Sequence, residues 1–113
     1  MPLEVELEQV DAATAVVKLT GRMTLGMRLR EIESQLNHAV EGGVRRLILE
    51  TSGVEYADSA GLGLLMQLSG KMKKVQGSLC IAAPSPMLQQ LLELTNTDKI
   101  LALYPDRAAA LAN

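Results

Sequence analysis

Short apolar segments alternate along this chain with longer segments whose apolar residues recur every three or four positions. The first pattern is typical of β-strands and the second of amphipathic helices. Strands are expected at residues 3–7, 14–21, 45–50, 78–83 and 100–103, and helices at 25–40, 59–75, 86–94 and 105–112. The order ββαβαβαβα requires crossover connections after a first hairpin. We therefore predict one α/β domain over residues 1–113, with a mixed sheet of about five strands and about four helices.

Residues at the expected element ends favour the same arrangement. The first helix is predicted to begin at Leu25, where the helical spacing starts, and to stop at the glycine pair 42–43. Ser85 suits the position that caps a helix, and Pro86 suits the first helical turn, where the missing N–H costs nothing.

Composition and charge exclude several classes of function. The chain has no Phe or Trp, two Tyr and a net charge of −2, so it lacks both the stacking platform and the basic field of a nucleic-acid-binding protein. Its one cysteine, Cys80, lies in an apolar run and its one histidine, His38, stands apart from other metal-ligand types. We expect no metal, no cofactor and no membrane insertion, and a cytoplasmic location.

The stretch EYADSAGLGLLM, residues 55–66, places a carboxylate and a hydroxyl at the mouth of an apolar helix. Side-chain oxygens at this position commonly cap the unpaired N–H groups of a helix, and that simple role accounts for either residue. If Asp58 is the cap, the hydroxyl of Ser59 is left to point outward. Gly61 and Gly63 cost helix stability, which close packing on the sheet or a partner's approach would explain.

The segment LILETSGVEYADSAGLGLL, with VVKLTGRM before it and PSPMLQQLLELTNTDKIL after it, resembles the STAS domains of sulfate transporters and anti-sigma factor antagonists. The resemblance covers nearly the whole chain. It implies a regulatory protein without enzymatic activity. In the family's stand-alone antagonists, the serine after the aspartate is phosphorylated by an anti-sigma factor that is itself a serine protein kinase, and the resemblance implies this role for Ser59. The unphosphorylated form would bind that factor, and the phosphorylated form would be released.

The sequence departs from the family after the second strand, where an acidic residue is common about three positions past the glycine. Here Thr24 occupies that position, and Arg22 precedes it. Arg22, near the phosphorylation loop, could hold a phosphate.

A partner-facing strip is predicted on the second helix. At about 100° per residue, we place Leu62, Met66, Ser69 and Lys73 opposite the apolar core stripe and beside Ser59. The full predicted partner-binding set is Arg22, Thr24, Asp58, Ser59, Gly61, Leu62, Gly63, Met66, Ser69 and Lys73. A weak homodimer is also compatible with the sequence.

A second function stays open at this point. Stand-alone STAS domains also serve membrane transport assemblies, including lipid-transport ATPases. In that role the same helix face would dock on an ATPase subunit, and Ser59 would only be a cap. An enzyme is disfavoured, because no set of acid, base and nucleophile can be assembled from the residues present.

Overall fold

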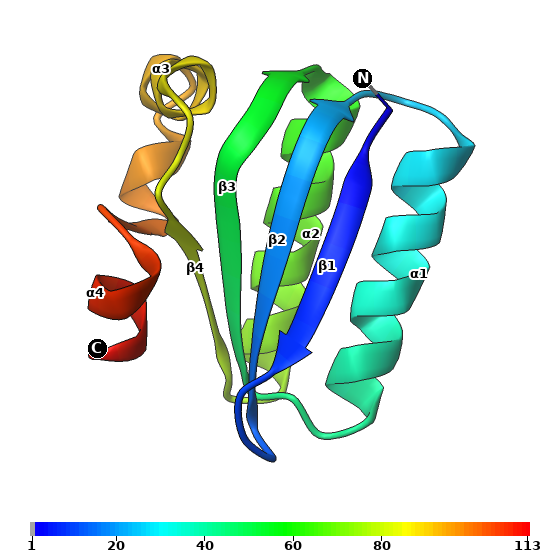
Figure 1. Cartoon of the computed structure of the whole chain (residues 1–113), viewed down its shortest axis with the longest axis vertical. Coiled ribbons are helices and arrows are strands. Elements are labelled where there is room, and N and C mark those ends of the chain that lie inside the picture. The colour runs from blue at the N-terminus through cyan, green and yellow to red at the C-terminus, as the bar shows by residue number, and fades with distance from the viewer. Residues whose placement is uncertain (1) are drawn as a thin grey trace.

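The computed structural model describes residues 2–113, and these form five strands and four α-helices in the predicted order (Figure 1). One 3-10 turn, η1, was not predicted. The elements are β1 (Glu4–Gln9), β2 (Thr14–Met23), α1 (Met27–Glu41), β3 (Arg46–Ala57), α2 (Ser59–Lys74), β4 (Ser78–Ala82), α3 (Pro86–Leu94), η1 (Thr97–Lys99), β5 (Ala102–Tyr104) and α4 (Arg107–Leu111).

The five strands form one mixed sheet in the order β1-β2-β3-β4-β5. Only the β1–β2 pair is antiparallel, and each later pair is parallel, as crossover helices require. The hairpin between β1 and β2 turns at Asp11, whose Oδ1 accepts the N–H groups of Ala13 and Thr14 at 2.9 and 2.8 Å. The predicted α/β fold with a mixed sheet is confirmed.

Two layers of apolar side chains cover the sheet. Helices α1 and α2 lie side by side against one face, where the larger core includes Leu19, Ile32 and Leu65 (Figure 1). The other face carries a smaller cluster that includes Ile48 and Cys80, covered by Ala110 of α4. No helix within residues 2–113 is long and apolar enough to cross a membrane.

Several predicted boundaries differ from the observed ones, and those of β3 and α1 matter for the site. Strand β3 was predicted to end at residue 50 but runs on to Ala57, so Glu55, just before the Asp-Ser pair, is in the strand. The added residues pair with β2 across two register irregularities, which lets Gly53 lie against Thr20. Helix α1 begins at Met27, and Leu25 lies before it in the connection from β2.

The predicted motif lies where β2 and β3 end and α1 and α2 begin. In Figure 1 all four of these ends meet at the upper edge of the sheet. The backbone N–H of Asp58 donates to the carbonyl of Met23 at 3.2 Å and joins the two strand ends. This edge brings together segments that are more than thirty residues apart, and it positions the candidate site.

Candidate functional site

Asp58 links two elements through the two oxygens of its carboxylate. Oδ1 accepts the N–H of Gly61 at 3.0 Å and caps α2, as predicted for this residue. Oδ2 accepts the N–H of Leu25 at 3.0 Å, in the connection between β2 and α1. The hydrogen bond from Leu25, followed by that from Gly61, lowers the pKa of Asp58 below the ordinary value of 3.8. Asp58 is therefore an ionised bridge at neutral pH.

Ser59 is the first residue of α2, and its side chain is exposed. Because Asp58 caps the N-terminus of α2, the Ser59 hydroxyl is not needed for that role. The hydroxyl thus stands at the positive end of a sixteen-residue helix, a position where added negative charge is tolerated locally. The Ser59 hydroxyl is therefore accessible to a modifying protein.

The two glycines after Ser59 have different roles. A Cβ on Gly61 would lie 2.3 Å from the carbonyl oxygen of Met23 and 2.9 Å from its Cβ, so Gly61 lets α2 approach the end of β2. Its predicted place in a partner surface is wrong, because the residue is buried. Gly63 is exposed, and a Cβ there would meet no atom within 4 Å. Only Gly63 leaves room for a partner.

The predicted strip along α2 is only partly exposed. Ser69 is 5% exposed and belongs to the buried face, so its predicted contact with a partner is wrong. Eight residues at about 100° each place it about 80° from Gly61, on the flank of the core stripe and not opposite to it. Leu62 and Met66 are half-buried, and Leu62 packs on the main core. Lys73 is exposed, as predicted.

Arg22 and Thr24 lie at the same edge as Ser59. The guanidinium of Arg22, near the end of β2, stands over the ring of Tyr56 with 4.7 Å from its carbon to the ring centroid. Thr24 is half-buried in the connection that follows. Phosphate binding by Arg22 stays a prediction. To bind a phosphate, the guanidinium would leave its contact with the Tyr56 ring.

Two exposed apolar side chains beside this edge were missed by the sequence reasoning. Leu25 is 72% exposed and Met27 is 80% exposed, on either side of Gly26. The helical spacing predicts Leu25 as the first apolar residue of the first helix, but the residue lies before that helix. The signal that it lies outside the helix is Gly26, which has a φ of +159° and no side-chain cap.

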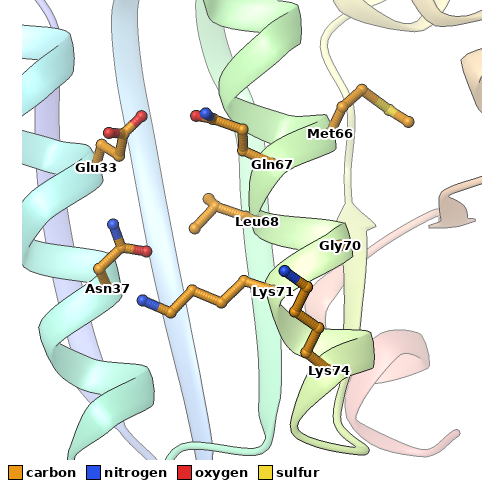
Figure 2. A pocket seen from close by; sticks show the side chains of 8 residues that line it. All are labelled: Glu33, Asn37, Met66, Gln67, Leu68, Gly70, Lys71 and Lys74. Atoms are coloured by element: carbon orange, nitrogen blue, oxygen red, sulfur yellow. The ribbon is translucent and has the colours of Figure 1, made fainter.

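A groove runs between α1 and α2 from the Ser59 end toward the far end of both helices. Figure 2 shows Glu33 and Asn37 of α1 facing Gln67 and Lys71 of α2, in a depression of about 430 Å³. A second depression of about 480 Å³ shares Glu33 and Gln67 with the first and reaches Gly63. The exposed side of α2 and this groove form one continuous surface that begins next to Ser59.

The sequence of the chain matches the model of a known family. A model of the STAS domain matches residues 4–110 of the chain. The chain belongs to the STAS domain family. The matched residues include the edge where β3 meets α2.

Several related STAS proteins carry a common description. An anti-sigma F factor antagonist of Lysinibacillus sphaericus is 25% identical over 91 residues, which is 80% of this chain and 77% of that protein. The crystal structure of an anti-sigma factor antagonist from Mycobacterium paratuberculosis has a TM-score of 0.84 and 26% identity, covering 98% of this chain and 92% of that one.

A third similar structure is the Bacillus cell fate determinant SpoIIAA in its phosphorylated form. It has a TM-score of 0.73 and 22% identity, with 88% of this chain and 90% of that chain covered. At this identity the likeness concerns the STAS fold alone.

Proposed function

We propose that this STAS protein is an anti-sigma factor antagonist of the cytoplasm, which binds a kinase-type anti-sigma factor until Ser59 is phosphorylated. The names of its relatives support the antagonist role. The observation that supports the switch is that Asp58 and Ser59, although neighbours, have different roles at the start of α2. Asp58 caps α2, and the Ser59 hydroxyl is exposed beside it.

The chemical step is a phosphoryl transfer from ATP that is bound to the partner. The Ser59 oxygen forms a bond to the γ-phosphorus, the bond from that phosphorus to the β-phosphate oxygen breaks, and the hydroxyl proton leaves. The products are phosphoserine and ADP. The antagonist provides the acceptor hydroxyl, and the partner provides the nucleotide and the catalytic groups.

Phosphorylation would change the interface more than the fold. The phosphate adds about −1.5 to −2 charges at neutral pH. At the N-terminus of α2 this charge meets a favourable helix dipole, so the domain stays folded. A partner surface shaped for a neutral hydroxyl would instead have to bury an unpaired charge, which opposes association.

The test is an affinity pull-down from the native host with three baits: wild type, Ser59→Ala and Ser59→Asp. We expect an anti-sigma factor with kinase activity to be retained by wild type and by the alanine variant, and lost by the aspartate variant. Equal retention of that factor by all three baits would contradict the switch.

The same experiment addresses the transport role that the sequence leaves open. Recovery of transport ATPase subunits with all three baits would favour an accessory subunit, in which Ser59 has only a structural part.

A further inference from the structure

The connection between β2 and α1 presents two large apolar side chains to solvent. Leu25 and Met27 are 72% and 80% exposed, and they flank Gly26. Single exposed apolar residues are common on protein surfaces. These two are separated only by Gly26 at the start of α1, and α1 begins at the same edge of the sheet as α2, whose first residue is Ser59 (Figure 1).

The position of this connection depends on Asp58. The backbone N–H of Leu25 donates to Oδ2 of Asp58 at 3.0 Å. Helix α1 begins after Gly26 without a side-chain cap, so no capping hydrogen bond at its own N-terminus holds the connection. The carboxylate that caps α2 therefore also fixes the backbone that carries Leu25.

Any kinase that phosphorylates Ser59 has to cover this region. The reacting phosphorus must come within about 3 to 3.5 Å of the Ser59 oxygen, and water must be kept from the site. Ser59 follows Asp58 in the chain, and Leu25 is one hydrogen bond away from Asp58. A surface that closes over Ser59 thus contacts the Leu25 segment as well.

Charges around the segment do not favour a strongly electrostatic contact. Leu25 borders two depressions, and both signs of charge surround them. The charged residues that line them are Arg22, Arg28, Arg30 and Glu33, and the carboxylate of Asp58 lies beside Leu25. Arg28 is already paired with Glu31 at 3.2 Å. The attraction that remains is apolar burial, which depends little on salt.

We propose that Leu25 and Met27 form the apolar anchor of the antagonist, that Asp58 positions this anchor, and that the kinase-type partner receives it in an apolar pocket. This inference rests on the proposed function and adds to it the kind of surface that the partner presents. Ser59 then acts as the switch at the rim of the anchor, and Asp58 is a positioning residue.

The first test is the affinity of the chain for the kinase that wild type retains and Ser59→Asp loses, measured by calorimetry with purified proteins. We expect the double variant Leu25→Ser with Met27→Ser to bind at least about tenfold more weakly. The matched control is Leu94→Ser, because Leu94 is 73% exposed at the end of α3, outside the connection that carries Leu25 and Met27. It should bind like wild type.

The second test separates positioning from capping. In Asp58→Ser the hydroxyl keeps the cap on α2 but is too short to reach Leu25 as well. We expect binding to fall at least about tenfold while the domain stays folded, with a Tm lowered by a few degrees because the Leu25 bond and the carboxylate charge are lost. Hydrogen exchange should become faster at the Leu25 amide and stay slow at the Gly61 amide.

The outcomes distinguish the anchor from the proposed function. If wild type binds the kinase and the Leu25→Ser, Met27→Ser double variant binds equally well, the anchor is wrong and the switch stands. If wild type retains no such kinase, both are wrong. If the double variant only abolishes self-association seen by analytical ultracentrifugation, the anchor's occupant is a second copy of the chain, and the proposal is overturned.

Discussion

Asp58 and Ser59 are neighbours in the chain, yet their side-chain oxygens have opposite surroundings. Both oxygens of Asp58 accept backbone N–H groups, from Gly61 and from Leu25. Ser59 is exposed at the start of α2. Asp58 therefore holds the structure, and its neighbour Ser59 is open to modification. Ser59 can be modified without loss of the hydrogen bonds that Asp58 makes.

The lowered pKa of Asp58 predicts a pH dependence. The hydrogen bonds from Leu25 and Gly61 favour the ionised carboxylate, so its contribution to stability is fully present above the ordinary pKa of 3.8. The contribution is lost as the pH falls through the lowered value. The difference in Tm between wild type and Asp58→Asn should be constant from about pH 7 to about pH 5 and shrink in stronger acid. A difference that grows in acid would contradict this assignment.

Gly61 and Gly63 offer a matched pair of substitutions. Gly61→Ala places a methyl group against the Met23 carbonyl, and we expect it to destabilise the domain by about 1 to 3 kcal/mol. Gly63→Ala meets open space, and it should stabilise the helix by up to about 1 kcal/mol. Urea unfolding of both variants measures the two changes.

The second of these variants also concerns function. Because Gly63 lies beside Ser59 on the exposed side of α2, Gly63→Ala should weaken partner binding while it stabilises the fold. Equal stability losses in the two variants would show that the glycines do not differ as described.

At the scale of elements, the short helix α4 depends on a residue from another part of the chain. The guanidinium of Arg46, at the start of β3, donates to the carbonyl of Leu111 at 3.0 Å and also to those of Ala110 and Asn113. These bonds satisfy the last carbonyls of a five-residue helix that is too short to be stable alone. Helix α4 in turn covers Cys80.

Removal of this cap should expose the thiol. In Arg46→Met we expect native-state labelling of Cys80 by a thiol reagent to become about tenfold faster, because α4 opens locally more often. Burial raises the pKa of Cys80, and the charge of Arg46 partly opposes that rise. Loss of the charge alone would slow labelling, so a faster rate reports exposure.

The control for this prediction lies in the same helix. Arg107 forms an ion pair with Glu8 at 2.7 Å, with both side chains substantially exposed, and such pairs contribute little. Arg107→Met should label like wild type. Equal labelling of the Arg46 and Arg107 variants would contradict the role given to Arg46.

Local sequence signals predicted most elements but not all of their ends. Ser85 accepts the N–H of Leu88 at 3.2 Å and caps α3, as expected from the residues around it. The end of β3 was missed because Gly53 favours a turn in isolation. In the sheet, Gly53 lies at an irregularity beside Thr20, where a Cβ would be 2.5 Å from Cγ2. Pairing with β2 decides its conformation.

At the scale of the whole molecule, the STAS domain carries the candidate site at one edge of its sheet. The serine and its capping neighbour could be predicted from adjacent residues. The bond between Asp58 and Leu25 could not, because it joins residues 33 positions apart that meet only when the sheet forms. The prediction of which α2 residues are exposed was partly wrong for the same reason. The burial of Ser69 depends on how the helix sits on the sheet.

The position of Ser59 at the start of α2 predicts that phosphorylation leaves the fold intact. Because the phosphate lies at the N-terminus of a helix, Ser59→Asp should have a Tm within a few degrees of wild type and the same circular dichroism spectrum. A large loss of Tm would indicate that release from the partner results from unfolding.

The most direct test of the central claim is the affinity of the purified kinase-type partner for the wild-type chain before and after stoichiometric phosphorylation of Ser59. We predict that phosphorylation weakens binding at least about thirtyfold, since an unpaired charge would be buried at the interface. Unchanged affinity, or phosphate found by mass spectrometry only at another residue, would contradict the account.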